Sequence, residues 1–289
     1  MVRIAIVGGG GMGEALLAGL LKGGRQVKEL VVAERSAKRA EYLAETYSVL
    51  VAPLAAAVEN ASYIVVAVKP ADVESVVAEI AEAASNADSS TVEQVLVSVA
   101  AGVSTAFFEA RMPAGFPVIR AMPNAPALVG AGVTALAAGR FATEEQLTEV
   151  AGLFERVGAV LRVSEPQLDA VTAVSGSGPA YFLLFVEALV DAAVAGGLSR
   201  SVATSLAVQT MAGTAEMLLD RMDAGRQQSA RGPARPDTTA AELRAVVTSP
   251  GGTTAAGLRE LERGGLRAAV GAAVEAAKTR SEQLGITAE

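Results

Sequence analysis

The first half of the chain alternates short apolar runs with longer segments that carry apolar residues at helical spacing. The apolar runs are Arg3–Val7, Leu30–Ala33, Tyr63–Val68, Val95–Val99 and Val118–Ala121. The helix-like segments between them are Met12–Leu21, Ala37–Thr46, Val73–Ala84 and Thr105–Arg111. Short buried strands that alternate with helices predict βαβ units, a mostly parallel, doubly wound sheet and helices on both of its faces.

Three further segments extend this α/β pattern. Gly132–Ala137 and Val160–Val163 are predicted as additional strands. Thr143–Val157 is predicted as a helix, because Thr143 can cap it and Gln146 stands in the capping-box position.

After about Ser164 the strand pattern ends and alanine-rich helical segments follow. They are Leu168–Val174, Pro179–Ala195, Ser201–Met222, Ala240–Val246, Ala255–Arg263 and Leu266–Leu284. We therefore expect an α/β domain over residues 1–164 and an all-α domain over residues 165–289. Between two of the helices, Asp223–Thr238 is polar and contains glycine and proline. Its composition favours a solvated loop, and its position before a Gly-Gly segment makes a lid the alternative.

Hydrophobicity raises the question of a membrane. The chain has 289 residues, is 51% hydrophobic and has a mean hydropathy of +0.39. Its most apolar stretch, Pro179–Leu198, is about as long as a membrane-spanning helix. Glu187 and Asp191 near its middle are costly in lipid. We expect no membrane span here, and instead a helix buried between subunits.

Charge and composition exclude several functions. Lys and Arg number 24 and Asp and Glu number 31, a net charge of −7, which argues against a nucleic-acid partner. Cysteine and histidine are absent, so thiolate nucleophiles and Ser-His-Asp triads are excluded and no metal site is expected. The N-terminus enters a strand without the pattern of a signal peptide, so we expect a cytoplasmic protein.

The first strand leads into a glycine-rich loop and then into a helix. Gly8, Gly10 and Gly13 occupy the three fixed positions of G-x-G-x-x-G. In that motif the first glycine makes the tight turn, the second admits the pyrophosphate and the third lets the helix pack on the strand. We therefore expect a Rossmann domain in which Gly8, Gly10, Gly11, Met12 and Gly13 contact a dinucleotide.

Two charged residues after the second strand bear on the choice of coenzyme. Glu34 stands where an acidic side chain binds the adenosine ribose 2′-OH, which favours NAD. Arg35 is the residue type that holds a 2′-phosphate, which favours NADP. We expect both at the adenosine site, and we predict NADPH as the coenzyme with NADH as the alternative.

Three more segments carry candidate chemistry. Ala67-Val68-Lys69-Pro70 follows a strand, at the edge where doubly wound sheets bind ligands. Val174–Tyr181 and Ser249–Thr254 each place small residues, hydroxyls and free N–H groups at a helix start, which suits a carboxylate or a cofactor amide. Plain N-capping is the alternative.

Six segments together resemble the pyrroline-5-carboxylate reductase family. They are Gly8–Gly13, Ala67–Pro70, Ser98–Gly102 (SVAAG), Arg120–Pro126 (RAMPNAP), Asp169–Tyr181 (DAVTAVSGSGPAY) and Ser249–Thr254 (SPGGTT). The resemblance covers almost the whole chain. It implies a Rossmann domain, a helical dimerisation domain and an active site between the first domain and the helical dimer. It also implies a homodimer that assembles to a decamer, and reduction of 1-pyrroline-5-carboxylate to L-proline, the last step of proline biosynthesis.

The resemblance further implies residue roles. Backbone N–H groups of Gly251 and Gly252 and the hydroxyls of Ser249 and Thr253 would bind the substrate carboxylate. Thr254 would hydrogen-bond the ring nitrogen, so Thr254 and Ser249 are the predicted catalytic residues, and Glu165 would lie near the substrate. The residues implied to line the coenzyme are Ala67, Val68, Lys69, Val99, Ala100, Ala101, Asn124, Ser175 and Ser177.

The sequence departs from the family just before Ser249. Many members carry a His-Pro segment and a Leu-Lys-Asp run there, where this chain has Asp223–Thr238 and Leu243-Arg244-Ala245. The resemblance therefore does not predict which contacts this chain makes just before Val247.

The implied reaction suits a chain without histidine or cysteine. A cyclic imine is basic enough to be partly protonated near neutral pH, so the protein has mainly to position two reactants and exclude water. Lys69 could act as an acid, but a plain charge near the cofactor or solvent is the favoured interpretation.

Two alternative functions remain. A β-hydroxyacid dehydrogenase or imine reductase would use a helix lysine, and the only lysine after Lys69 is Lys278, near the C-terminus. A non-catalytic NADP-binding sensor would keep Gly8–Gly13 without needing Ser249–Thr254.

Overall fold

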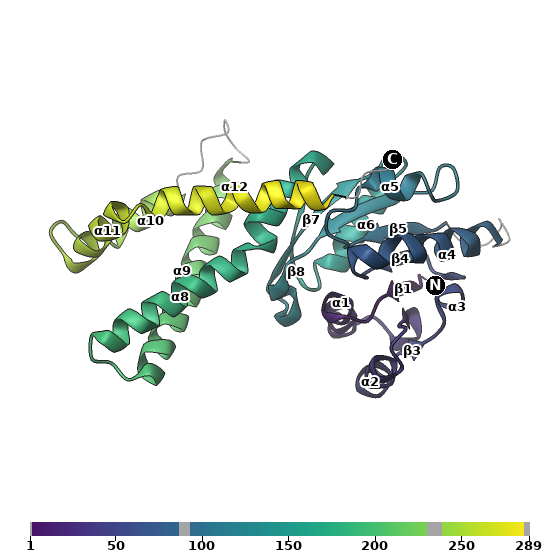
Figure 1. Ribbon diagram of the computed structural model, residues 1–289, viewed down its shortest axis with the longest axis horizontal. Helices are drawn as coiled ribbons and strands as arrows, with labels where there is room; N and C mark the ends of the chain where they lie inside the picture. The colour runs from purple at the N-terminus through teal and green to yellow at the C-terminus, as the bar shows by residue number, and fades with distance from the viewer. Residues whose placement is uncertain (1, 87–92, 230–238, 286–289) are drawn as a thin grey trace. The chain divides into compact units, whose positions relative to one another are not determined.

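The computed structural model describes residues 2–86, 93–229 and 239–285 (Figure 1). The chain folds into two compact units. Unit 1 comprises Met1–Pro179 and Val274–Glu289, and unit 2 comprises Ala180–Ala273. The last helix is thus divided between the units, whereas the sequence pattern places the whole of residues 165–289 in one helical domain.

Unit 1 contains an eight-stranded sheet in the order β3-β2-β1-β4-β5-β6-β7-β8. All neighbouring strands are parallel except β6 and β7. The strands are β1 (Ile4–Val7), β2 (Leu30–Ala33), β3 (Leu50–Val51), β4 (Tyr63–Val66), β5 (Val95–Ser98), β6 (Val118–Met122), β7 (Gly132–Ala138) and β8 (Gly158–Arg162). The predicted doubly wound, mostly parallel sheet is confirmed.

Helices cover both faces of this sheet. They are α1 (Gly11–Lys22), α2 (Ala37–Tyr47), α3 (Leu54–Val58), α4 (Val73–Asn86), α5 (Thr105–Glu109) and α6 (Glu144–Phe154). Short 3₁₀ turns join some of the elements: η1 (Val27–Glu29), η2 (Pro70–Asp72), η3 (Ala125–Val129) and η4 (Glu165–Gln167). The capping box predicted for α6 is present, with the N–H of Gln146 donating to the Thr143 hydroxyl at 3.2 Å.

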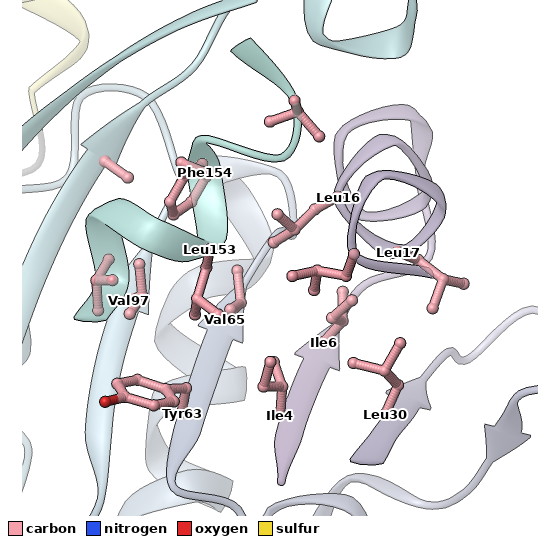
Figure 2. Packing of buried hydrophobic residues seen from close by; sticks show 14 of the residues in the cluster. Ile4, Ile6, Leu16, Leu17, Leu30, Tyr63, Val65, Val97, Leu153 and Phe154 are labelled. Carbon is pink, nitrogen blue, oxygen red and sulfur yellow. The ribbon is translucent and has the colours of Figure 1, made fainter. Parts of the chain in front are cut away.

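Alternate residues of the central strands supply two separate cores. Ile4 and Ile6 of β1 point to the face covered by α1 and α6, where Figure 2 shows them among Leu16, Leu17 and Phe154. Ala5 and Val7 point to the other face, against α3, α4 and α5. Because strand side chains alternate with period two, strands buried on both faces consist of consecutive apolar residues.

Two short elements have no counterpart in the prediction. They are β3, which pairs with β2, and α3, which packs on the sheet. Both are too short to show a periodic pattern, and β3 is an edge strand with an exposed Leu50.

After β8, the chain forms α7 (Leu168–Val171) and then a π-helical turn, Thr172–Gly176. A helix was predicted over Leu168–Val174, and the wider turn replaces its second half. α7 packs against β7, where Leu168 lies with Ala135 and Ala137. The C-terminal end of α12 also belongs to unit 1, and there Ser281 donates a 2.6 Å hydrogen bond to Asp169.

Unit 2 is helical. Its elements are α8 (Gly178–Ala195), α9 (Arg200–Ser229), α10 (Thr239–Val246), α11 (Thr253–Arg263) and the first part of α12 (Leu266–Leu284). α8 and α9 lie side by side and share a small buried cluster of Val190, Ala203 and Ala207 (Figure 1).

The loop predicted over Asp223–Thr238 is wrong in its first part, because α9 continues to Ser229. This stretch contains the good helix formers alanine, arginine and glutamine, and a single glycine within a helix costs only about 1 kcal/mol. Residues 230–238 of the predicted loop lie outside the described residues.

Candidate functional site

The glycine-rich loop after β1 has little room for side chains at its two ends. Gly8 has φ +101°, and a Cβ there would lie 2.7 Å from the carbonyl oxygen of Ala67. A Cβ on Gly13 would collide with the carbonyl oxygen of Gly8. Gly10 and Gly11, by contrast, face open space. The loop is therefore tight where it turns and open where a pyrophosphate would approach it.

Gly9 is a constrained position that the motif does not mark. A Cβ on Gly9 would collide with Leu43 of α2. Its N–H donates to Glu34 Oε2 at 2.9 Å, and its carbonyl accepts from Arg39 Nε at 2.6 Å. Both backbone polar groups of Gly9 are thus hydrogen-bonded to side chains. The run of four glycines was the only sign of this constraint in the sequence.

Glu34 uses both carboxylate oxygens on the backbone. Oε2 accepts the N–H of Gly9, and Oε1 accepts the N–H of Ser36 at 2.8 Å. The side chain expected at the ribose therefore also fixes the shape of the glycine-rich loop. Its contact with a ribose stays a prediction.

Arg35 forms an ion pair at the same edge of the sheet. Its Nη2 lies 2.7 Å from Oδ1 of Asp72 in η2, and 75% of the Arg35 side chain is exposed. The hydrogen bond to Asp72 raises the pKa of Arg35 above its usual value. The guanidinium therefore stays charged in the accessible pH range.

A polar cluster joins α1 to α2 behind the loop. Glu14 accepts hydrogen bonds from Tyr42, Tyr47 and Arg39. Burial raises the pKa of Glu14, but these hydrogen bonds outweigh it and hold the pKa below its usual value. Burial, and then the hydrogen bond to Glu14, raise the pKa of Tyr47 to about 12.

The other residues expected near the coenzyme follow neighbouring strands at the same edge. Ala67, Val68 and the exposed Lys69 come after β4, and Val99, Ala100 and Ala101 come after β5. Asn124 follows β6, is 9% exposed and accepts the N–H of Val133 at 2.9 Å through Oδ1. Because parallel strands end at one edge, the fold gathers these residues beside Gly8–Gly13.

The segment around Ser175 and Ser177 leads into α8, which begins at Gly178 as the sequence pattern predicted, but the residues before Gly178 are themselves helical. It lies within one helical run, Glu165–Ala195, and contains the π-turn. The N–H of Ser177 donates to Thr172 O at 2.9 Å, and the Ser175 hydroxyl donates to Val171 O at 2.9 Å. These groups are therefore used within the helix, and π-turns of this kind are frequent at functional sites.

The glycine between these serines lies close to another of the segments that suggested the family. A Cβ on Gly176 would lie 2.9 Å from Cε of Met122 at the end of β6. The π-turn thus packs against the Arg120–Pro126 segment, so two of the segments that suggested the family meet within unit 1.

Glu165 has protein partners for both of its oxygens. Oε1 accepts the N–H of Thr105 at 2.7 Å and Oε2 accepts the Thr105 hydroxyl at 2.5 Å. Nη1 of the buried Arg120 lies 3.4 Å from Oε1. Glu165 therefore ties η4 to the start of α5 and to β6, and its place near a substrate stays a prediction.

The Ser249–Thr254 loop lies in unit 2 and opens α11 as predicted. Gly251 has φ +72°, which favours glycine, and Gly252 is the N-cap residue with no side-chain cap. The first N–H groups of a helix have no partner within it. A helix start capped by glycine leaves these donors to a ligand, and their positive end of the dipole favours an anion.

These features define a class of protein. A parallel sheet with this glycine-rich loop is the coenzyme-binding domain of nicotinamide-dependent oxidoreductases. Two family models match the chain: NADP oxidoreductase coenzyme F420-dependent over residues 3–102, and pyrroline-5-carboxylate reductase dimerisation over residues 165–284. The chain belongs to the pyrroline-5-carboxylate reductase family, whose reaction is that of an oxidoreductase acting on a CH–NH group.

Similarity to individual relatives extends over the full length. A pyrroline-5-carboxylate reductase of Mycobacterium tuberculosis (strain ATCC 25618 / H37Rv) is 67% identical, with 100% of this chain and 99% of the relative covered. A solved structure of the Coxiella burnetii enzyme superimposes with a TM-score of 0.87 at 33% identity, covering 99% of each chain. The Plasmodium falciparum enzyme with NADP bound superimposes with a TM-score of 0.80 at 28% identity, covering 99% of this chain and 98% of that one. The alternative of a β-hydroxyacid dehydrogenase or another imine reductase is therefore not supported.

Proposed function

We propose that this chain is a pyrroline-5-carboxylate reductase that uses NADPH to form L-proline. Hydride passes from C4 of the reduced nicotinamide to the C=N carbon of 1-pyrroline-5-carboxylate, and the ring nitrogen ends with one proton. The observation that carries the proposal is the glycine-capped start of α11 in Ser249–Thr254, in a chain that also has the complete dinucleotide loop. The first feature suits a carboxylate and the second a dinucleotide.

The coenzyme site we propose is the carboxyl edge of the sheet in unit 1. Gly8–Gly13 and the N-terminus of α1 receive the pyrophosphate, because Gly10 and Gly11 face open space and α1 begins at Gly11. Glu34 and Arg35 bound the adenosine. Bound NADPH supplies the hydride. The residues after β4, β5 and β6 orient the nicotinamide half, together with Ser175 and Ser177.

The substrate site we propose is the Ser249–Thr254 loop. The free N–H groups of α11 and the Ser249 and Thr253 hydroxyls hold the carboxylate. Thr254 donates to, or relays a proton towards, the ring nitrogen. This places no strong acid at the site, which agrees with a substrate that is itself partly protonated near neutral pH. Glu165 acts by anchoring Thr105 and Arg120 near the substrate.

The assembly we propose is a homodimer through the helical domain, residues 165–289, with further assembly to a decamer. Support for a homo-oligomer comes from the dimerisation model and from the exposed apolar residues of α8, among which Phe182, Leu183 and Leu184 are 64–66% exposed in the single chain. By length and composition alone, one helical run within the described residues, Glu165–Ala195, could cross a membrane. A helix covered by a second subunit has the same composition, so we propose an interface and a cytoplasmic protein.

The test is nicotinamide absorbance in a mixture of the protein, pyrroline-5-carboxylate and either NADPH or NADH. Rapid oxidation that requires the imine is the expected result, faster with NADPH. The competing proposal is a non-catalytic NADP-binding sensor. Coenzyme binding without oxidation would favour that sensor and overturn the reductase.

A further inference from the structure

The Arg35–Asp72 ion pair joins the two sides of the dinucleotide loop. β1 lies between β2 and β4, and Val7 pairs with Ala33 on one side and Val66 on the other. Arg35 follows β2, and Asp72 ends η2, which follows β4. Since the three strands are parallel, the pair links segments that flank Gly8–Gly13 at the edge where ligands bind.

This edge is where the adenosine half of a dinucleotide lies, because the position of Glu34 marks its ribose. Glu34 already accepts the N–H groups of Gly9 and Ser36, at 2.9 and 2.8 Å. The carboxylate of Glu34 thus already has partners within the protein. The neighbouring Arg35 is well suited to bind a 2′-phosphate, since its guanidinium offers several donors in a plane. In this structure, however, Nη2 of Arg35 donates to Asp72 at 2.7 Å.

We propose that Asp72 is a specificity-determining residue, whose carboxylate competes with the 2′-phosphate of NADPH for the guanidinium of Arg35. The inference rests on the proposed use of NADPH. With side chains 75% and 34% exposed, the pair is screened by water. A 2′-phosphate carries more charge than a carboxylate, so it can replace Asp72 as the partner of Arg35. NADH has a neutral hydroxyl there and offers Arg35 no such partner.

The competition acts in two ways. Arg35 must leave Asp72 before it can pair with the phosphate, which lowers the apparent affinity for NADPH. After the exchange, the carboxylate of Asp72 remains as a like charge near the phosphate. Removing the charge of Asp72 should therefore strengthen NADPH binding, and removing Arg35 should weaken it.

The chain offers a matched control. Glu74 lies on α4, close to Asp72 in sequence, and its side chain is 79% exposed. Its carboxylate pairs with Arg111 at 3.9 Å. Glu74→Gln removes the same charge from the same region without touching the partner of Arg35.

The experiment is a titration of the full-length protein with NADPH and with NADH, followed by coenzyme fluorescence. We expect Asp72→Asn to lower the Kd for NADPH about two- to fivefold, the range of exposed ion pairs. The difference in Kd for NADPH between Asp72→Asn and the wild type should become smaller at high salt. Glu74→Gln should bind NADPH like the wild type. A Kd for NADPH that is unchanged or raised in Asp72→Asn would overturn the proposal.

A double-mutant cycle tests the competition itself. Arg35→Ala should raise the Kd for NADPH, and adding Asp72→Asn to it should then have little effect. An equal effect of Asp72→Asn with and without Arg35 would show a general charge effect and overturn the proposal. Tight NADPH binding without imine reduction would overturn only the proposed function, whereas failure of the wild type to bind NADPH would overturn both.

Discussion

Units 1 and 2 bury their apolar residues to very different degrees. In unit 1, two clusters cover the two faces of the sheet, and they include fully buried residues such as Phe108, Ile64 and Leu17. In the described part of unit 2, the buried apolar residues are Val190, Ala203 and Ala207. The two units have similar apolar compositions but only one of them completes a core.

This difference separates two roles. Unit 1 carries the proposed coenzyme edge, whose shape depends on contacts within a single chain such as those of Glu34 with Gly9 and Ser36. Unit 2 carries the proposed substrate loop on helices whose apolar residues are largely exposed in the described part of a single chain. The family model that matches residues 165–284 is a dimerisation model, and we propose that a second copy of these helices covers them. We therefore expect substitutions in unit 1 to act on one chain, and those in unit 2 to act on the assembly.

The largest effect should come from a charge placed among the exposed apolar residues of α8 in unit 2. Leu184→Glu places a carboxylate where a partner would exclude water, and in a two-fold interface the substitution occurs twice. We expect the dissociation constant of the oligomer to rise about a thousandfold, which corresponds to about 4 kcal/mol. Sedimentation velocity over a dilution series measures it.

Leu50→Glu is the matched control for Leu184→Glu. Leu50 is 56% exposed on β3 and Leu184 is 66% exposed on α8, so both are equally apolar and similarly accessible in one chain. Leu50→Glu should leave the oligomer unchanged. An assembly that survives Leu184→Glu at all dilutions would contradict the contrast between the units.

The next largest effect should come from the core of unit 1. Phe108 is fully buried and packs edge-on against Phe107 at 5.6 Å between ring centroids. Phe108→Ala should lower the free energy of unfolding by about 3 to 5 kcal/mol. Urea unfolding followed by tyrosine fluorescence suits this test, because three of the four tyrosines, Tyr42, Tyr47 and Tyr63, lie in unit 1.

Protein concentration separates this effect from one on the assembly. The loss caused by Phe108→Ala should be the same at all protein concentrations, whereas Phe182→Ala in unit 2 should act in a concentration-dependent way. The opposite pattern would show that unit 1 also depends on the partner for its stability.

A smaller effect should come from separating turnover, which we assign to unit 2, from coenzyme binding, which we assign to unit 1. Thr254→Ala removes the hydroxyl proposed to serve the ring nitrogen, and we expect kcat to fall about tenfold, which corresponds to about 1.4 kcal/mol. The Kd for NADPH should stay unchanged, because its proposed site is in unit 1. Gly13→Ala should instead raise the Kd for NADPH, since its Cβ would collide with the carbonyl of Gly8 and distort the proposed coenzyme loop. Normal turnover in Thr254→Ala would remove this hydroxyl from the mechanism.

The sequence predicts most of the fold, because its signals are local. Buried strands such as Leu30–Ala33 and helices such as Leu266–Leu284 have the predicted bounds. The capping box of α6 was also found from two residues, Thr143 and Gln146. The α9 extension to Ser229 was missed because Gly225 and the prolines beyond it outweighed good helix formers.

The candidate site was less accessible to sequence reasoning, because its contacts are long-range. The hydrogen bonds that Gly9 forms with Glu34 and Arg39 link residues that are 25 and 30 positions apart, respectively. The π-turn at Thr172–Gly176 packs against Met122, about 50 positions earlier in the chain, and no local pattern encodes that contact. The Arg35–Asp72 pair needs the sheet order, since it links segments on either side of β1.

The smallest effect should come from how the two units cap their helices. In unit 1 the Thr143 hydroxyl caps α6, whereas in unit 2 the N-cap residue of α11 is Gly252, which provides no side-chain cap. Thr143→Ala should lower the free energy of unfolding by about 1 kcal/mol and leave turnover unchanged. Thr148→Ala is the control within the same helix, because its hydroxyl donates to the carbonyl of Glu144 and accepts from the exposed Arg162 side chain, but accepts no backbone N–H at the helix start. It should change the free energy of unfolding by less than about 0.5 kcal/mol. Equal losses in the two variants would mean that the Thr143 cap does not stabilise α6, and would contradict the contrast with α11, the proposed substrate-binding helix.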